Sequence, residues 1–286
     1  MNKPLVSVCM ITYNHENYIK QALEGVLMQQ CSFDLELILS NDASTDETDK
    51  LIKEILRDTN AISLRYTNHP KNIGMIPNFK YALEQCKGSY IAICEGDDYW
   101  TDPLKIQKQI DFLEQHPSFA LCFHNVNLYD ENLKTIYRDT ITRPVSEITN
   151  LKDVARGNYI HTPSVVIRNS FILPDWFVNV YLGDWSLYMI AVGSKKIKKF
   201  PESMAVYRIS DGAAWSTQEK KIRKENSRRT VAIIAEKAEL PKKVQKILNL
   251  RLSANKSSRI NNLTLVKILK RIGKFLYRKL NHKKKF

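Results

Sequence analysis

The sequence predicts an α/β fold with a mostly parallel, Rossmann-like central sheet flanked by helices. Three observations support this prediction. Short apolar runs rich in β-branched residues recur through the N-terminal half, segments with helical periodicity separate them, and polar residues follow where the runs end. Strands that alternate with helices form right-handed βαβ units, so successive strands are expected to lie parallel.

Four strand-like runs lie in the N-terminal half, at residues 5–11, 35–40, 62–67 and 90–94. An apolar stripe predicts the first helix at 18–27. Ser44 or Thr45 is expected to cap the second helix. The third helix runs through residues 79–83, after a loop that contains proline and glycine.

The C-terminal half gives weaker signals. A helix is expected between Pro103 and Pro117, and residues 127–160 are expected to form polar loops without a regular period. The remaining predicted elements are strands at 119–126, 165–167 and 204–209 and a helix at 185–192.

An acidic motif ends the fourth strand. In S-Y-I-A-I-C-E-G-D-D-Y-W, a buried apolar run gives way to Glu95, Asp97 and Asp98, which should emerge together at the carboxyl end of the strand. Hard divalent cations such as Mg²⁺ or Mn²⁺ bind carboxylate oxygens and leave other positions to water and phosphates. The motif therefore indicates a metal site, while an acidic turn is the simpler alternative.

The ends of the first and second strands should face the same crevice as the acidic motif. Tyr13 could stack on a base, and Asp42 could accept a hydrogen bond from a base or ribose. A metal would neutralise phosphates beside them. This combination suits a nucleotide diphosphate, although the sequence has neither G-x-G-x-x-G after the first strand nor G-K-[ST].

The net charge of +14 is concentrated at the C-terminus. Of the 44 Lys and Arg residues, 15 lie in residues 241–286, which contain no acid, so 29 basic residues face 30 acidic ones before that point. This distribution argues against a nucleic-acid partner. The five cysteines form no C-x-x-C pair, which favours a reducing compartment and argues against structural zinc.

Six segments together resemble the family 2 glycosyltransferases, which have the GT-A fold. In order, they are V-S-V-C-M-I-T-Y-N, N-D-A-S-T-D, N-I-G with a following Asn78, G-S-Y-I-A-I-C-E-G-D-D-Y-W, G-D-W-S-L-Y and Y-R-I-S-D-G-A-A-W-S. The match covers roughly residues 4–216, and the motifs are specific as a set. Members of the family are typically inverting, metal-dependent enzymes that use nucleotide sugars, often UDP-linked, and many act in bacterial surface-polysaccharide assembly.

The resemblance implies roles for individual residues. Those assigned to nucleotide binding are Thr12, Tyr13, Asp42, Asn72 and Asp97. Asp97 and Asp98 match the D-x-D-type motif that holds ribose and a Mn²⁺ or Mg²⁺ ion, and Asp184 in G-D-W matches the catalytic base. Candidate diphosphate or acceptor contacts are Glu95, Arg208 and Trp215.

Some of these residues also have simpler interpretations. From spacing alone Asp184 is a helix N-cap or a helix-dipole partner, and only the family match favours a base. Arg208 is equally suited to a surface ion pair. The sequence departs from the family pattern at Ile11, Asn41 and Glu95, and Ser210 stands where close relatives often have histidine, which puts a role of that histidine in metal or phosphate binding in doubt.

The predicted function is an inverting glycosyltransferase that moves a sugar from a UDP-type donor to a hydroxyl of a glycan or lipid-linked glycan. A sugar nucleotidyltransferase would share the fold type and metal, but should have a glycine-rich basic loop after its first strand. A nucleotide- or membrane-binding module without catalysis is the third hypothesis. Residues 1–220 are expected to form the catalytic domain and 221–286 a basic helical extension.

The extension has the pattern of a helix that lies in a membrane interface. The apolar residues at helical spacing are Leu265, Ile268, Leu269, Ile272, Leu276 and Leu280, and basic residues fill much of the remaining surface. A helix packed on the catalytic domain is the alternative. No apolar run approaches the ~20 residues needed to span a bilayer, and the N-terminus has no small-residue cleavage site. The expected location is cytoplasmic, peripheral on the inner face of the membrane, with anionic lipid as a partner.

Overall fold

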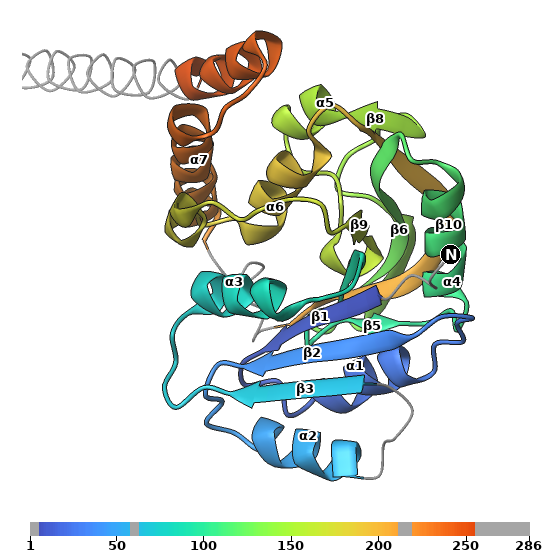
Figure 1. The fold of residues 1–286 in the computed structure, drawn as a ribbon. Helices are drawn as coiled ribbons and strands as arrows, with labels where there is room; N and C mark the ends of the chain where they lie inside the picture. The colour runs from blue at the N-terminus through green and yellow to red at the C-terminus, as the bar shows by residue number, and fades with distance from the viewer. Residues whose placement is uncertain (1–5, 58–62, 211–218, 255–286) are drawn as a thin grey trace, which may run out of the picture.

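The computed structural model describes residues 6–57, 63–210 and 219–254. The strands are β1 (Val6–Thr12), β2 (Leu35–Asn41), β3 (Ser63–Asn68), β4 (Tyr90–Ile93), β5 (Tyr99–Trp100), β6 (Phe119–Asp130), β7 (Thr135–Thr140), β8 (Ile148–Asn150), β9 (Val166–Arg168) and β10 (Lys196–Ile209). The helices are α1 (Ile19–Leu27), α2 (Thr48–Arg57), α3 (Met75–Gln85), α4 (Lys105–Gln115), α5 (Leu151–Ala155), α6 (Gly183–Val192) and α7 (Lys220–Lys237), with 3-10 turns η1 (Thr162–Ser164) and η2 (Asp175–Asn179). Among the described residues the strands form one sheet with the order β3-β2-β1-β4-β9-β6-β10-β5, and β7 and β8 pair with β6 and β10 (Figure 1).

The half of the sheet around β1 is parallel, and the predicted α/β fold is confirmed. β1 pairs with β2 and β4, and β2 pairs with β3. In this register Thr12 lies beside Asn41, and Asn41 lies beside Asn68. The carboxyl ends of these strands therefore share one edge, where open α/β sheets bind ligands.

The second half of the sheet is mixed. β9 runs antiparallel between β4 and β6, whereas β10 runs parallel to β6 and antiparallel to β5. Because β5 follows β4 after only five residues, the acidic motif spans the turn between a parallel strand and the strand that pairs with β10. β10 thus lies next to the acidic motif, although more than a hundred residues separate them in sequence.

Helices cover both faces of the sheet, which explains why the first strands are apolar throughout. In β1, Val8 and Met10 belong to the core cluster under α1, α2 and α4, while Cys9 and Ile11 belong to the cluster under α3, α5, α6 and α7 (Figure 1). All seven residues of β1 are buried. A side-chain period of two therefore places apolar groups in two cores at once.

The prediction that residues 127–160 form only loops is wrong. β6 continues to Asp130, β7 and β8 follow, and α5 begins at a capping box formed by Asn150 and Asp153. The strands escaped detection because β7 is largely exposed and β8 has three residues, so neither has a buried apolar face. For the same reason β10 begins at Lys196 and not at 204, since its first half is rich in lysine.

The described part of the C-terminal extension packs on the body. α7 and the helical residues 242–254 contribute Val231, Ile234, Val244 and Leu248 to the core cluster under α6. This stretch therefore shares a core with the predicted catalytic domain. No helix within the described residues is long and apolar enough to cross a membrane. The amphipathic stretch from Leu265 to Leu280 lies outside the described residues.

Candidate active site

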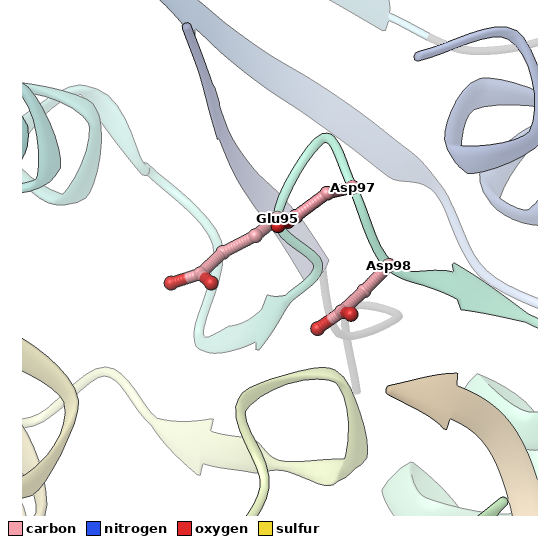
Figure 2. Close-up of side chains that lie close together, drawn as sticks. All are labelled: Glu95, Asp97 and Asp98. Carbon is pink, nitrogen blue, oxygen red and sulfur yellow. The ribbon is translucent and has the colours of Figure 1, made fainter. Parts of the chain in front are cut away.

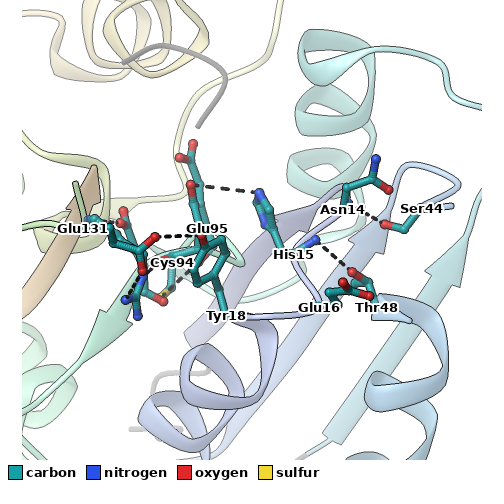
Figure 3. A network of polar contacts seen from close by, with 12 residues as sticks. Asn14, His15, Glu16, Tyr18, Ser44, Thr48, Cys94, Glu95 and Glu131 are labelled. Carbon is teal, nitrogen blue, oxygen red and sulfur yellow. Dashed lines mark hydrogen bonds and ion pairs between the residues drawn. The ribbon is translucent and has the colours of Figure 1, made fainter. Parts of the chain in front are cut away.

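The loops that follow β1 and β2 are locked together at the edge of the sheet. Asn14 and Ala43 adopt left-handed backbone conformations with φ of 55° and 56°. The Asn14 main-chain nitrogen donates to Ser44 Oγ at 2.9 Å, and the Thr45 nitrogen donates to Asn14 Oδ1 at 2.8 Å (Figure 3). Ser44 and Thr45 therefore brace the loop instead of capping α2 as expected. Asp46 stabilises the N-terminus of α2, because its Oδ1 accepts from the Thr48 nitrogen at 3.0 Å.

The predicted nucleotide-binding residues line this edge in different ways. Tyr13 is 41% exposed, so its ring is free to stack, whereas Thr12 is 2% exposed. Asp42 is buried, and its two carboxylate oxygens accept from the main-chain nitrogens of Ile73 and Gly74 at 2.7 and 2.9 Å. Asp42 thus fixes the loop that precedes α3.

Asn72 lies in that same loop. It is exposed, and its Oδ1 accepts from the Gly74 nitrogen at 3.0 Å. Thr12, Tyr13, Asp42 and Asn72 therefore come from neighbouring loops at one edge of the sheet, as the sequence predicts, although the observed bonds of Asp42 and Asn72 are internal to the protein.

The turn between β4 and β5 brings three carboxylates together. One oxygen each from Glu95, Asp97 and Asp98 lies within 4.8 Å of the others (Figure 2). The turn sits tightly on the end of β1, because a Cβ on Gly96 would lie 2.6 Å from Thr12 Oγ1 and 2.9 Å from His15 Nδ1. Only glycine fits at this position.

Without a cation, burial and mutual repulsion disfavour the ionised form of the carboxylates in this cluster. Burial, followed by the charges of Asp97 and Asp184, raises the pKa of Glu95 to about 8. Burial, Asp97 and Glu95 raise the pKa of Asp98 well above its ordinary value, although Arg208 opposes the shift. Asp98 Oδ2 is buried and has no hydrogen-bond partner among the described residues. Three crowded carboxylates with an unpaired buried oxygen are a donor set suited to a hard divalent cation.

Arg208 braces the acidic turn. It is 7% exposed, and its main-chain nitrogen donates to Asp98 Oδ1 at 2.8 Å. Its Nε donates to the Asp97 carbonyl oxygen at 2.8 Å, and its two terminal nitrogens donate to Glu131 and Gln21 at 3.1 and 2.7 Å. All three guanidinium nitrogens thus have protein acceptors. Nη1 and Nη2 each carry a second N–H beyond these bonds, so the diphosphate or acceptor contact of Arg208 stays a prediction.

Aromatic rings enclose the Arg208 guanidinium. They belong to Tyr18, Tyr99 and Tyr129, at 4.9, 5.2 and 5.7 Å from the guanidinium carbon. The Tyr18 hydroxyl donates to Glu131 Oε2 at 2.8 Å, so Glu131 joins Tyr18 to Arg208 (Figure 3). This network ties α1, β6 and β10 to the turn that holds the acids.

Asp184 approaches the same space from the other half of the chain. It lies in the first turn of α6, where Leu182 is the N-cap and makes no side-chain cap bond. Its Oδ2 accepts from Asn158 Nδ2 at 2.7 Å. Burial raises the pKa of Asp184, while the Trp185 main-chain nitrogen and Asn158 lower it. Its charge is also among the causes that raise the pKa of Glu95, after burial and the charge of Asp97.

Two tyrosines lie near both groups and were not singled out from the sequence. Burial raises the pKa of Tyr188 well above its ordinary value, with added effects of Asp184 and Glu95, and its hydroxyl has no partner in the described part of the chain. Tyr207 shows the same direction, caused by burial and then by Asp98 and Glu95. Its ring contacts His161 at 4.8 Å between centroids. Tyr188 follows Asp184 by four residues, which puts the two on the same face of α6. This spacing points to Tyr188 only after Asp184 has been identified as a site residue.

Two further positions named from the sequence are Trp215 and Ser210. Trp215 lies outside the described residues. Ser210, which stands where relatives often have histidine, is 2% exposed, and its Oγ has no hydrogen-bond partner among the residues that the structure describes. A serine hydroxyl there lies beside the end of β10, next to the residues that brace the acidic turn.

Comparison with known proteins identifies the family of the chain. A family model described as Glycosyl transferase family 2 matches residues 7–172. An uncharacterised protein of Mycobacterium tuberculosis is 39% identical over 213 residues, which make up 73% of this chain and 60% of that protein. The chain thus spans less than two thirds of the length of that relative.

Two solved structures share the fold. Staphylococcus aureus TarS 1-349 in complex with UDP-GlcNAc matches with a TM-score of 0.62 and 17% identity, over 88% of this chain and 70% of TarS 1-349. The mannosyltransferase PcManGT from Pyrobaculum calidifontis, in complex with GDP-Man and Mn²⁺, matches with a TM-score of 0.60 and 14% identity, over 88% and 70%. At such identities the likeness concerns the fold. The family model, by contrast, covers more than half of the chain, and the chain therefore belongs to glycosyltransferase family 2.

Proposed function

We propose that this chain is an inverting glycosyltransferase that moves a sugar from a nucleotide diphosphate, UDP by preference, to a hydroxyl group. One observation supports this function above all. The carboxylates of Glu95, Asp97 and Asp98 lie together at the end of β4, and a separate buried carboxylate, Asp184 in the first turn of α6, is coupled electrostatically to Glu95. Leaving-group stabilisation and proton removal need these two features on opposite sides of an anomeric carbon.

Asp97 and Asp98 are the proposed ligands of Mn²⁺ or Mg²⁺. The unpaired Oδ2 of Asp98 and the mutual repulsion of the cluster fit such an ion. A bound divalent ion supplies Lewis-acid stabilisation of the departing diphosphate. The protein's own contribution is the bracing by Arg208, which fixes Asp98 Oδ1 and the Asp97 carbonyl before any ligand binds.

Asp184 is the proposed general base. In its deprotonated form it would accept the proton of the acceptor hydroxyl as that oxygen bonds to the anomeric carbon. Burial, which raises the pKa of Asp184, makes the carboxylate a stronger base than a solvated aspartate. Glu95 belongs to the same carboxylate cluster as Asp97 and Asp98, and its carboxyl group is the proposed contact to the diphosphate or the acceptor.

The nucleotide is proposed to bind at the edge formed by the loops after β1 and β2. Tyr13 offers an exposed ring for the base, and Thr12 Oγ1 is buried without a partner in the described chain. Asp42 and Asn72 shape the opposite loop. The fold neighbours are recorded with UDP-GlcNAc and GDP-Man, which supports a nucleotide sugar as the donor class.

The acceptor is proposed to be a glycan or a lipid-linked glycan, reached at the cytoplasmic face of a membrane. The support is the basic, amphipathic sequence from Leu265 onward. Basic side chains near an anionic leaflet contribute about 1 kcal/mol each.

A donor screen tests the function. The full chain is incubated with Mn²⁺ and UDP-glucose, UDP-galactose, UDP-GlcNAc or GDP-mannose, and released nucleoside diphosphate is measured with water as the acceptor. We expect slow release from at least one donor, dependent on Mn²⁺ and lost in Asp184→Asn. Nucleotide sugar formed from a sugar phosphate and a nucleoside triphosphate, with release of pyrophosphate, would instead identify a nucleotidyltransferase. Donor binding without turnover under any condition would favour a binding module.

A further inference from the structure

We propose that Asn158 is a positioning residue for the general base: its side-chain amide holds the Asp184 carboxylate in the orientation that receives the acceptor proton. The bond that supports this inference runs from Asn158 Nδ2 to Asp184 Oδ2 at 2.7 Å. The inference rests on the proposed role of Asp184 as the base.

The orientation of the Asn158 amide is itself fixed. Its Oδ1 accepts from the main-chain nitrogen of Ile160 at 3.1 Å, so the NH₂ group must face Asp184. Residues on both sides anchor this segment: Tyr159 and Ile160 are 0% and 2% exposed, and the Gly157 nitrogen donates to the Val154 carbonyl at 2.9 Å. The donor therefore comes from a rigid segment.

The surroundings make a neutral donor important to Asp184. Within the part of the chain that the structure describes, the ionisable groups whose charges couple to it are Glu95 on the acidic turn, Tyr188 on α6 and Tyr207 on β10, and each of these is neutral or negative. None can offset the charge of the carboxylate. The groups that stabilise its ionised form are the Trp185 main-chain nitrogen, the Asn158 side chain and the main-chain nitrogen of Asp184 itself, so Asn158 is the one side chain among them.

Nearby cations bind elsewhere. Arg143 donates to the carbonyl oxygens of Asp153 and Gly157, and Arg251 donates to the carbonyl oxygen of Ala155. These arginines hold the segment that carries Asn158. The side-chain amide is thus the link between that segment and the carboxylate.

A purely structural role for Asn158 makes a different prediction. If Asn158 only closed the turn to Ile160, loss of its accepting oxygen would lower turnover, whereas loss of its amide donor would not. Asn158→Asp separates the two roles, because an aspartate of the same size keeps the acceptor for the Ile160 nitrogen and removes the amide donor. Asn158→Ala removes both.

The experiment compares both variants with the matched control Asn125→Ala, which removes a side-chain amide bond to the Pro201 carbonyl far from Asp184 in the chain. Donor turnover with Mn²⁺ is measured against pH, using whichever of UDP-glucose, UDP-galactose, UDP-GlcNAc or GDP-mannose turns over fastest. Nucleotide affinity is measured separately by titration with UDP or GDP.

In Asn158→Asp and Asn158→Ala, kcat should fall about ten- to a hundred-fold, as expected for a lost hydrogen bond to a charged group. The acid limb of the pH profile should move to higher pH, furthest in Asn158→Asp, because the lost donor and the added carboxylate both raise the pKa of Asp184. Nucleotide affinity and the control should stay close to wild type.

An unchanged acid limb in Asn158→Asp, or full turnover in that variant, would overturn the inference. If Asn158→Ala fails to fold, Asn158→Asp still tests the inference, because it keeps the acceptor for the Ile160 nitrogen. The inference about Asn158 can be wrong while the proposed function is correct. In that case Asp184→Asn abolishes turnover while the Asn158 variants keep the wild-type profile, whereas full turnover in Asp184→Asn would remove Asp184 as the base and refute both.

Discussion

The main-chain nitrogen of Arg208 lies 2.8 Å from Asp98 Oδ1, and this bond joins the last strand of the sheet to the acidic turn. The side chain of the same residue holds the Asp97 carbonyl at 2.8 Å. Two neighbouring acids are thus fixed by one residue that follows them by more than a hundred positions. The carboxylates need this bracing because they repel one another.

Replacing a proposed metal ligand should separate metal binding from folding. In Asp97→Asn and Asp98→Asn, the dependence of turnover on Mn²⁺ should disappear, because the charge that binds the ion is lost without opening a cavity. Thermal unfolding with and without Mn²⁺ measures the effect: wild type should be stabilised by the ion, and the variants should not. Asp111→Asn, on the exposed side of α4, is the matched control. Metal-dependent turnover near wild type in both variants would refute the assignment.

Replacing the proposed base should leave donor binding intact. Asp184→Asn keeps the size of the side chain, so nucleotide affinity should be unchanged, while turnover falls about 10²- to 10⁴-fold. Titration with UDP and initial-rate measurements give the two quantities. If affinity fell in proportion to rate, Asp184 would belong to the donor site instead.

Arg208→Lys should weaken the metal site although the positive charge is kept. A lysine retains the main-chain bond to Asp98 but cannot reach the Asp97 carbonyl, Glu131 and Gln21 together. We expect the free energy of unfolding to fall by about 1 to 3 kcal/mol and Mn²⁺ affinity to decrease. Urea denaturation and Mn²⁺ titration test this. A variant that lost only UDP affinity, with metal affinity and stability unchanged, would support the diphosphate contact.

The acidic cluster should give stability an unusual dependence on pH. The pKa of Glu95 rises from 4.5 to about 8 on folding, so between these values the folded state binds more protons than the unfolded state. Without metal, the contribution of Glu95 to the free energy of unfolding should therefore decrease as pH rises from 6 to 8, against an opposite contribution from His161 and Lys105, whose pKa values are lowered by burial. With Mn²⁺ the trend should reverse, because the ion binds deprotonated carboxylates.

Urea denaturation at pH 6, 7 and 8, with a chelator or with Mn²⁺, measures this pH dependence. Glu95→Gln should remove the contribution of Glu95 to the metal-free trend, whereas Glu24→Gln on the exposed face of α1 should not. A difference in metal-free stability between wild type and Glu95→Gln that does not change from pH 6 to 8 would contradict the predicted charge state of Glu95.

The C-terminal sequence should bind anionic membranes. Deleting residues 261–286 removes nine of the 44 Lys and Arg residues together with the amphipathic stretch. The shortened protein should no longer co-sediment with phosphatidylglycerol vesicles at low salt, while UDP binding stays intact. Phosphatidylcholine vesicles are the control for charge. Sedimentation that the deletion leaves unchanged would place any membrane contact elsewhere.

The sequence predicted correctly those strands that are buried and that end in residues with recognisable chemistry. Three strands of the parallel half, β1, β2 and β4, are buried along their whole length, and the acids and the aromatic residue follow the ends of β4 and β1, so both the fold and the edge could be predicted. The exposed β7 and the lysine-rich start of β10 were missed because they bury little apolar surface.

The bracing of the site could not be predicted from the sequence. The contacts of Arg208 with Gln21, Asp98 and Glu131 join parts of the chain that are distant in sequence, and no local pattern reports them. Asn158 fell within a stretch interpreted as polar loop, where an asparagine is unremarkable. Its role becomes visible only when α5 and α6 are placed side by side.

The position of β10 in the sheet also bears on how the protein is made. A ribosome releases the three acids long before Lys196–Ile209, the strand that pairs with β5 and braces the acidic turn. A nascent chain that ends at β9 thus contains the whole acidic cluster as unbalanced charge, without the residue that fixes it. The bracing of the acidic turn has to wait for β10, so an interrupted translation product would have the three acids but not the bonds that hold the turn.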